Sequence, residues 1–316
     1  MSRVSRVTAG LIATAVAGVL TVTTVQPGAS AAPTTAAPTA AVPRPAHFTV
    51  SSFNVLGASH TPPGGSRAAG TTRIVWANQL LERHHIDVAG FQEMQAPQLT
   101  KFLAITKGEW AVYPGLQLNR IDSENSVGWR TDKFTLVSST TLTIPYFNGH
   151  PRRMPLVLLR DKTTGMLAYF ANFHNPAETA KYRNQDRYRA AATTIEIALQ
   201  NALYRRGIPR FMTGDMNERA PYFCRVTAES PVVAARPTSV RRDGACYAGR
   251  PRSVDWIFGA RKVDFSNYVE DRSPLVAKTT DHPVIVSDVT VSPGKLPRAW
   301  NRPVAPPMPT FPLPTS

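Results

Sequence analysis

The sequence predicts an α/β fold of two mixed β-sheets with a few flanking helices. The folded part opens with a strand, a helix and a second strand, a pattern typical of a parallel strand pair joined by a crossover. A series of short runs rich in β-branched and aromatic residues follows, and each run predicts a further strand. Beyond the opening, only one long stretch has helical spacing, so few helices are expected.

The opening unit contains two strands and the helix between them. The expected elements are a strand over 47–54, a Gly/Pro/Ser-rich loop over 57–70, a helix over 72–84 and a strand over 86–92. Thr71 or Thr72 is the predicted N-cap of the helix. The buried face of this helix is predicted to carry Ile74, Ala77 and Leu81.

The remainder of the chain is mostly strands separated by turns. Strands are predicted at 111–113, 126–130, 134–137, 155–160, 166–173, 210–213, 253–258 and 284–291. The one long helix is predicted over 179–204 and is ended by Gly207 and Pro209. Its buried stripe is predicted to be Ala191, Ile195, Ala198, Leu199 and Ala202.

Compositional shifts divide the chain into four parts. A basic start, an apolar run over 11–25 and the small-residue exit Ala29-Ser30-Ala31 predict a secretory signal over 1–31, cleaved near Ala31. A membrane anchor is the alternative, but the run is short for a bilayer span. The other expected parts are a flexible Ala/Pro/Thr-rich linker over 32–46, one domain over 47–293 and a disordered Pro-rich tail over 294–316. The protein is therefore expected to be secreted.

The chain is strongly basic and contains only two cysteines. A formal net charge of +15 favours polyanionic partners such as nucleic acid or anionic lipid, although it could serve solubility alone. Cys224 and Cys246 are expected to pair in an exported chain. Neither has a His or Cys neighbour at metal-ligand spacing, which excludes a zinc site there.

Polar residues recur where predicted strands pass into loops. They are Asn54, Glu93, Asn172, His174, Asp215, Asn217, Asp255, Asp281 and His282. Strand ends are where α/β proteins place their chemistry. Hydrolysis of a phosphodiester needs a hard cation, a base for water and donors for the developing charge, and these residue types can supply each requirement. Each residue also has an alternative interpretation as a purely structural residue, such as a salt-bridge partner for Glu93 or turn residues for Asp215 and Asn217.

Six blocks carry these residues in order along the chain. They are Ser52-Phe53-Asn54, Gly90-Phe91-Gln92-Glu93, Asn172-Phe173-His174, Gly214-Asp215-Met216-Asn217, Ser253-Val254-Asp255 and Thr280-Asp281-His282-Pro283. Singly each block is a weak signal, but the ordered set resembles the signature of the endonuclease/exonuclease/phosphatase superfamily. That superfamily includes deoxyribonuclease I-like nucleases, abasic-site endonucleases, bacterial sphingomyelinases and inositol-phosphate phosphatases. The resemblance spans about residues 48–291.

The resemblance implies a fold and a set of roles. The implied fold is a four-layer α/β-β/α sandwich with the site at one edge of the paired sheets. The implied cofactor is Mg²⁺, with Mn²⁺ or Ca²⁺ as alternatives, held by Glu93 with Asn54 beside it and Asp281 nearby. The implied catalytic residues are His174, Asp215, Asn217, Asp255 and His282. The Asn172 block adds Asn172 as a substrate-binding candidate, and deoxyribonuclease-like members also tolerate a disulfide in the position of Cys224 and Cys246.

Two blocks depart from the usual pattern of the superfamily. The last block has Thr280 where Ser is usual and no residue between His282 and Pro283, which leaves the strand register after His282 open. The Asn172 block continues as His174-Asn175-Pro176 without an apolar residue, a change that affects the rim of the site. Outside the blocks, Arg153 is a candidate for contact with substrate phosphates, and an exposed basic turn is its alternative.

The predicted function is a secreted, metal-dependent phosphodiesterase that acts as an endonuclease on DNA or RNA by in-line attack of water. His282 and Asp215 are both candidates for the base. One alternative is a sphingomyelinase-like phospholipid phosphodiesterase, for which Pro145-Tyr146-Phe147-Asn148 would be the membrane-contacting hairpin. Others are an inositol-phosphate phosphatase and a non-catalytic basic binding module. No stable protein partner is predicted, and a monomer is expected.

Overall fold

The computed structural model describes residues 43–62, 64–249, 252–300, 302 and 306–309. The predicted signal over 1–31 and most of the predicted linker lie outside the described residues. None of the helices in the described ranges has the length and apolar character needed to cross a membrane.

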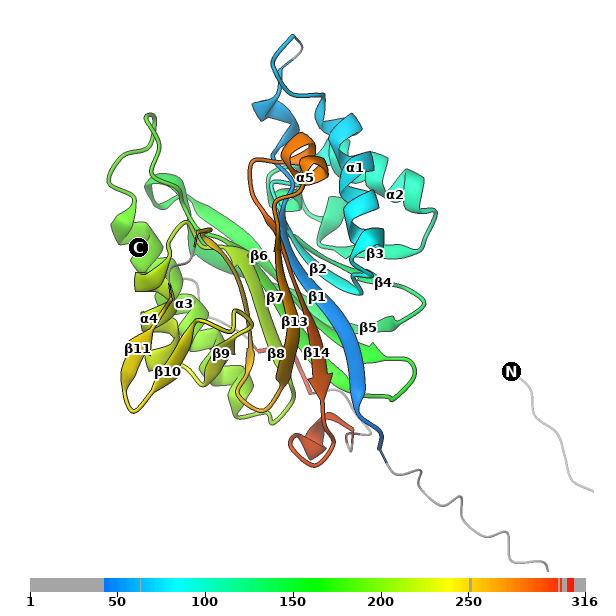
Figure 1. Cartoon of the computed structure of the whole chain (residues 1–316), viewed down its shortest axis with the longest axis vertical. Coiled ribbons are helices and arrows are strands. Elements are labelled where there is room, and N and C mark those ends of the chain that lie inside the picture. Colours follow the sequence, from blue (N-terminus) through cyan, green and yellow to red (C-terminus); the bar gives the residue numbers. More distant parts are fainter. Residues whose placement is uncertain (1–42, 63, 250–251, 301, 303–305, 310–316) are drawn as a thin grey trace, which may run out of the picture. The chain divides into compact units, whose positions relative to one another are not determined.

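Two six-stranded mixed sheets form the centre of the fold (Figure 1). The first sheet has the order β13-β14-β1-β2-β4-β3 and consists of β13 (Asp264–Asp271), β14 (Val284–Val291), β1 (Ala46–Asn54), β2 (Val88–Gln92), β4 (Ser126–Arg130) and β3 (Trp110–Tyr113). The second has the order β5-β6-β7-β8-β12-β9 and consists of β5 (Phe134–Pro145), β6 (Pro151–Asp161), β7 (Leu167–His174), β8 (Arg210–Asp215), β12 (Asp255–Ala260) and β9 (Val232–Ala234). The short strands β10 (Val240–Arg242) and β11 (Ala245–Tyr247) pair separately.

Helices cover the outer face of each sheet, which confirms the four-layer sandwich. In Figure 1 the first sheet is covered by α1 (Gly70–Arg83), α2 (Ala96–Thr106) and α5 (Pro274–Thr279), and the second by α3 (Asp186–Tyr204) and α4 (Ala220–Glu229). One buried apolar cluster lies between the sheets, and one lies under each helical layer. This division follows from sequence, because strands covered on both faces must be apolar on both faces.

The interface between the sheets is mainly aromatic but becomes polar toward one edge. Phe48 of β1 meets Phe134, Phe170 and Phe211 edge-on, with ring centroids 5.3–5.7 Å apart. Nearer the edge that carries the predicted site, β2 approaches β7 and β8 closely at Gly90. A Cβ at Gly90 would overlap the Asn172 amide and the Thr213 hydroxyl, so only glycine allows this approach.

The predicted opening is confirmed, with β1 parallel to β2 and α1 as the crossover. The N-cap prediction is wrong, because α1 begins at Gly70 and its N-cap residue is Ala69. Several elements escaped prediction: α2, α4, α5, β9, β10, β11 and β13. Most of them are short or exposed, and their apolar periodicity is therefore weak.

The prediction for the long helix is only partly right. Helix α3 starts at Asp186 instead of 179, because the Glu178 carboxylate accepts the backbone N–H groups of Asn184 and Gln185 and holds the preceding segment as a loop. The predicted stripe is right at Leu199 and partly right at Ile195, which is half-buried against the core, but wrong at Ala191 and Ala198, which are exposed. The buried face includes Ala192, Ile197 and Leu203 together with the polar residues Glu196 and Gln200, so apolar spacing alone pointed to the neighbouring face.

Part of the predicted disordered tail packs against the domain. Residues Pro297–Ala299 form a 3-10 helix, and the side chains of Leu296 and Ala299 are buried against the inter-sheet cluster. The Arg302 guanidinium donates to the Arg206 carbonyl at 2.8 Å. In the described residues, the domain therefore extends past its predicted end at 293.

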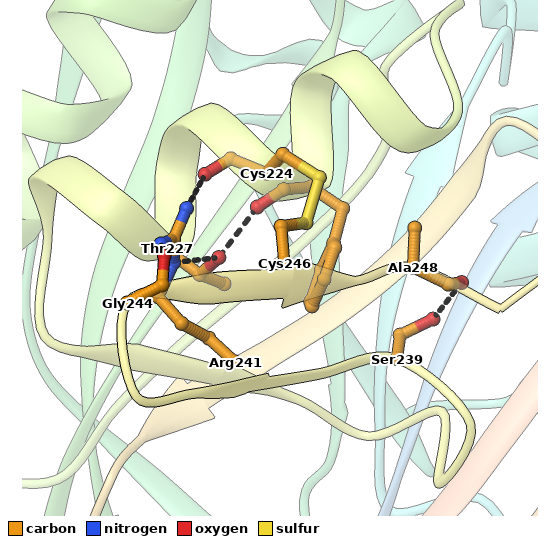
Figure 2. Close-up of a disulfide and its surroundings, with 8 residues drawn as sticks. Cys224, Thr227, Ser239, Arg241, Gly244, Cys246 and Ala248 are labelled. Carbon is orange, nitrogen blue, oxygen red and sulfur yellow. Dashed lines mark hydrogen bonds between the residues drawn. A yellow bond between two sulfur atoms is a disulfide. The ribbon is translucent and has the colours of Figure 1, made fainter.

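The expected disulfide between Cys224 and Cys246 is present and joins α4 to β11 (Figure 2). Arg241 reinforces the same junction, since its guanidinium donates to the Cys224 carbonyl at 2.9 Å. The Ser239 hydroxyl donates to the Ala248 carbonyl at 2.7 Å and closes the base of the hairpin. The β10–β11 hairpin is thus attached to α4 by one covalent bond and by the Arg241 hydrogen bond, while the Ser239 bond closes the hairpin itself.

Candidate active site

Strand register brings three of the predicted residues onto one rung of the second sheet. His174 at the end of β7 pairs with Asp215 at the end of β8, and Asp215 pairs with Asp255 at the start of β12. Side chains on one rung project to the same face and lie about 5 Å apart at Cβ. His174, Asp215 and Asp255 are all buried, with 7%, 1% and 1% of their surfaces exposed.

Asn54 links the two sheets at this edge. Its amide nitrogen donates to Glu93 Oε1 at 2.9 Å and to Asp215 Oδ2 at 3.1 Å, while its Oδ1 accepts the backbone N–H of Leu56 at 3.0 Å. The Leu56 N–H fixes the amide orientation, because it requires an acceptor. Asn54 was predicted to ligate the metal, but in this structure it presents N–H groups to the carboxylates and holds Glu93 and Asp215 together.

Glu93 follows β2 in a left-handed backbone conformation, with φ of 60°. Its Oε2 accepts the Gly57 N–H at 2.8 Å, and its side chain retains 20% exposure. Burial acts to raise the pKa of Glu93, but the positive charge of His174 and the hydrogen bonds from Asn54 and Gly57 outweigh it and hold the pKa below its usual value. Glu93 is therefore a preformed anion at neutral pH.

His282 lies between two carboxylates. Its Nδ1 is 3.1 Å from both oxygens of Asp255, and its Nε2 is 3.5 Å from Asp215 Oδ2. Burial lowers the pKa of His282, but Asp255 and Asp215 more than compensate and raise it to about 10, while burial raises the pKa of Asp255 to about 6. Around neutral pH the pair is thus an imidazolium and a carboxylate.

Thr280 and Asn175, which mark the two departures from the superfamily pattern, both make hydrogen bonds within the site. The Thr280 hydroxyl donates to the Asn54 carbonyl at 2.7 Å and accepts the His282 N–H at 3.2 Å, which connects the final block to β1. The Asn175 carbonyl accepts the Asn217 side-chain amide at 2.8 Å, and the Asn217 N–H donates to Asp215 Oδ1 at 3.0 Å. The polar residue after His174 therefore helps to position Asn217.

Asp281 and Glu93 line a cavity of about 530 Å³ beside the buried cluster. The 57–70 loop also lines this cavity, in part through His60 and Arg67. His60 Nε2 lies 3.4 Å from Glu93 Oε2, and Arg67 donates to the carbonyls of Ala277 and Thr280 at 2.9 and 3.0 Å. His60 was assigned no role from sequence because it lies in an irregular loop, where no periodicity indicates its neighbours.

The structure does not support two predicted substrate contacts. Asn172 is fully buried; its amide donates to the Phe91 and Ser126 carbonyls, and its Oδ1 accepts Gln92 Nε2 at 2.6 Å. It bridges the two sheets instead of facing a ligand. Arg153 Nε donates to Asp122 Oδ2 at 2.6 Å, and among the described residues no hydrogen bond joins it to the cluster.

Tyr146 is a further polar residue at the site that sequence did not indicate. Its hydroxyl lies 3.4 Å from His174 Nδ1, and the Arg152 guanidinium lies over its ring at 4.6 Å from the centroid. Burial raises the pKa of Tyr146 above its ordinary value, so the phenol remains a proton donor. In the sequence Tyr146 belongs to the segment Pro145-Tyr146-Phe147-Asn148. That segment was interpreted as an exposed hairpin, so no contact between Tyr146 and the site was predicted.

A hard divalent cation fits the donor chemistry of this edge. Glu93 and Asp281 offer carboxylate oxygens to the cavity, and oxygen ligands are the preference of Mg²⁺, Mn²⁺ and Ca²⁺. Asp215, Asp255 and His282 form a second candidate group, whose ligand atoms lie within 4.8 Å of one another in the described part of the chain. In that second group the carboxylates already face both nitrogens of His282, which leaves the Glu93 side better suited to a cation.

Neither a protein-family model nor a curated protein sequence matches the chain, but solved structures do. An endonuclease/exonuclease/phosphatase family protein from Bacteroides thetaiotaomicron has a TM-score of 0.62 at 18% identity, covering 79% of this chain and 97% of its own. A mannosyl-6-phosphatase from the same species has a TM-score of 0.60 at 19% identity, covering 77% and 99%.

A third similar structure is Danio rerio TDP2 complexed with a single-strand DNA product. It has a TM-score of 0.55 at 16% identity and covers 77% of this chain and 98% of its own. In all three cases nearly the whole of the other chain is matched, so the likeness extends over the entire sandwich. This protein therefore has the fold of the endonuclease/exonuclease/phosphatase proteins.

Proposed function

We propose that this protein is a metal-dependent phosphodiester hydrolase whose substrate is nucleic acid. The observation that carries the proposal is the convergence of five sequence blocks, up to 228 residues apart from Asn54 to His282, on one hydrogen-bonded cluster at a sheet edge. Asn54, Glu93, Asp215, Asp255 and His282 are joined there by contacts of 2.9–3.5 Å. A structural ion-pair network would not need an open cavity beside it, whereas a hydrolase does.

Glu93 and Asp281 are the residues that would hold the cation. When bound, the cation would neutralise a phosphoryl oxygen and stabilise the charge that develops during displacement. Asn54 keeps the Glu93 carboxylate in place by donating to Oε1, and Gly57 does the same at Oε2. This preorganisation removes the need for the ligand to reorient during the reaction.

Asp215 is the better candidate for the base. Both ring nitrogens of His282 face carboxylates, so His282 is placed to donate protons and not to accept one from water. The Asp215 carboxylate lies at the centre of the cluster, within 3.6 Å of His174 Nε2, and can accept a proton from an attacking water. His282, held by Asp255, would then stabilise the negative charge on phosphate or protonate the leaving oxygen.

Charge and the structural neighbours support nucleic acid as the substrate. The net charge of +15 attracts polyanions, and one similar structure, TDP2, holds a single-strand DNA product. Secretion is part of the same proposal, supported by the signal-like start of the sequence and by the disulfide. Another similar structure is a mannosyl-6-phosphatase, so a sugar or inositol phosphate is the second substrate class to test.

The test is a substrate and metal panel on the mature protein and on Glu93→Gln. With Mg²⁺, Mn²⁺ or Ca²⁺, the wild type should hydrolyse single-stranded or double-stranded DNA or RNA in preference to sphingomyelin and inositol phosphates. Chelation should abolish the activity, and Glu93→Gln should reduce it by about 100-fold or more. Glu109→Gln is the matched control, because Glu109 is an exposed glutamate that pairs with Arg130 away from the cluster. Full activity in chelator, or equal activity in the two variants, would overturn the proposal.

A further inference from the structure

A row of aromatic rings leads from His174 to the surface of the protein. The His174 and Tyr146 rings have centroids 5.6 Å apart, Tyr146 and Phe147 4.5 Å, and Phe147 and Tyr182 4.3 Å. Phe147 and Tyr182 are stacked, with an interplanar angle of 15°. Tyr146 is buried, whereas Phe147 and Tyr182 are half-buried, so the row begins beside the buried cluster and ends in solvent.

The outer end of this row is held in place from both sides. The 145–151 turn carries Phe147 and the segment before α3 carries Tyr182, and two hydrogen bonds connect them. The Gln185 side-chain oxygen accepts the Asn148 N–H at 2.9 Å, and the Gln185 amide donates to Asn148 Oδ1 at 3.0 Å. These two hydrogen bonds hold the two segments together. The half-exposed Phe147–Tyr182 stack is therefore a fixed surface on which a ligand can pack.

Three exposed cations lie on the chain segment that carries Tyr182. Lys181 Nζ lies 5.1 Å from the centre of the Tyr182 ring, Arg183 is the next residue along the chain, and the Arg187 guanidinium lies 4.6 Å from the centre of the Tyr188 ring. Across the described residues, no ion pair includes Lys181, Arg183 or Arg187. The two acids of the same segment are already engaged. Glu178 accepts backbone N–H groups, and Asp186 pairs with Arg189, so the surface around Tyr182 is positive.

We propose that Phe147, Tyr182, Lys181, Arg183 and Arg187 form a binding track for a single nucleic-acid strand next to the scissile phosphate. A base would stack on the exposed parts of the Phe147–Tyr182 pair, and the three cations would contact the neighbouring phosphates. This combination of aromatic platform and positive groove binds single strands without sequence preference. The inference rests on the proposed function, since it extends the same site along its substrate.

The arrangement favours a polyanion over a lipid surface. A membrane-contacting hairpin inserts apolar side chains into lipid, but here the aromatic rings lie against one another and a lysine covers one of them. The hairpin role considered for Pro145-Tyr146-Phe147-Asn148 is therefore not the one that the contacts support. Tyr146 faces inward to His174, and only Phe147 of the two rings reaches solvent.

The test measures binding separately from catalysis. Fluorescence anisotropy with a labelled oligothymidylate is measured on full-length Glu93→Gln, and Tyr182→Ala or Lys181→Ala/Arg183→Ala is added to that background. Tyr182→Ala should weaken binding about 5- to 100-fold, while Tyr182→Phe should retain it. The double variant should also flatten the dependence of log Kd on log salt by about 0.7 per lost phosphate contact. Tyr247→Ala and Lys101→Ala, an exposed tyrosine and an exposed lysine on other elements, should bind as the parent does.

The remaining outcomes separate this inference from the proposed function. If oligonucleotide binding is unchanged in Tyr182→Ala and in the double variant, the binding track is refuted even when hydrolysis is confirmed. If binding falls in these variants but the wild type hydrolyses no nucleic acid, the track stands and the proposed function fails. The binding track would also be refuted if the protein bound anionic vesicles through these residues and did not bind the oligonucleotide through them. In the active protein, Tyr182→Ala should raise KM for the oligonucleotide more than it lowers kcat. If the substitution instead displaced His174, the main effect would be a lower kcat.

Discussion

Asp255, which is buried, and His282, which is half-buried, form a carboxylate–imidazole pair in which each group influences the protonation of the other. Asp255 contacts Nδ1 through both of its oxygens at 3.1 Å, and the two aspartates around His282 raise its pKa to about 10 despite burial. A raised pKa means that His282 stays charged through neutral pH and loses its proton only as the pH approaches that value. The pair thus keeps a positive charge at the site.

Replacing Asp255 should therefore lower the pKa of His282. In metal-free protein, Asp255→Asn should shift the NMR titration of the His282 ring downward by about one unit or more, because one of its two carboxylates is removed. The same change should reduce hydrolysis by about 100-fold, since the ring loses the group that orients it. Asp264→Asn, at an exposed aspartate that pairs with Lys295, is the control. An unshifted titration would mean that Asp255 does not control the charge of His282.

Glu196 is a second buried acid, located on α3 behind the site. Its Oε2 accepts the Tyr222 hydroxyl at 2.6 Å, and burial raises its pKa to about 7 from an ordinary value of 4.5. The folded state therefore holds this proton more tightly than the unfolded state does. Below about pH 4.5 both states are protonated, and as the pH rises toward 7 the unfolded state ionises first, so the free energy of unfolding falls.

Glu196→Gln should remove this pH dependence. Above pH 7 the ionised Glu196 costs the folded state roughly 3 kcal/mol relative to the unfolded chain, and glutamine carries no such cost. Denaturant unfolding between about pH 5 and 8 should show the wild type losing stability relative to Glu196→Gln as pH rises. Glu229→Gln, at an exposed glutamate of α4, should leave the wild-type slope unchanged. Parallel curves for wild type and Glu196→Gln would contradict the buried-acid account.

At the scale of elements, the disulfide joins a helix and a hairpin that lie outside the rung of His174, Asp215 and Asp255. Cys224 is in α4 and Cys246 in β11, whereas the rung is formed by the ends of β7, β8 and β12. The bond closes a loop with a sequence separation of 22 residues. In the chain-entropy account such a crosslink stabilises by restricting the unfolded chain.

Removing the disulfide should therefore affect stability more than catalysis. Cys224→Ser/Cys246→Ser should lower the free energy of unfolding by roughly 3 kcal/mol, measured by denaturant titration. Its kcat on nucleic acid, measured well below the unfolding transition, should stay within about twofold of wild type. Reduced wild-type protein is the natural comparison and should behave as the double variant does. A large loss of kcat in the folded variant would show that the α4–β11 junction positions the rung after all.

At the scale of the whole molecule, the basic charge should dominate association with substrate. A chain of net charge +15 that contacts phosphates releases counterions, and its affinity for a single strand falls with salt by about 0.7 in log–log slope for each contact. For Glu93→Gln bound to an oligothymidylate, log Kd should rise linearly with log salt with a slope of about 2 or more. Hydrolysis of the small ester bis(4-nitrophenyl) phosphate by wild type should change little over the same range. A flat salt dependence for the oligonucleotide would exclude a phosphate-contacting surface.

Sequence reasoning succeeded where the signal is local. The parallel β1–β2 opening, the strand ends at Asn54 and Asp215 and the Cys224–Cys246 bond all agree with expectation. Continuous apolar runs report strands that are covered on both faces, because successive side chains of a strand point to opposite faces and both faces are buried here. The prediction of the buried face of α3 failed because its signal is not local. Glu196 and Gln200 are polar residues at core positions, and tertiary contacts decide whether a polar residue is buried.

By itself the sequence determined the two-sheet class of this protein and the strand ends at which its polar residues lie, since strand composition and turn chemistry are encoded by neighbouring residues. Only the tertiary structure decided which of those residues share a site. It buried Asn172 between the sheets, turned the Asn54 oxygen away from the carboxylates, paired Arg153 with Asp122 and brought His60 beside Glu93. The physical reason is that distances between remote side chains depend on strand register and on how closely the sheets approach, and neither is visible in any short stretch of the chain.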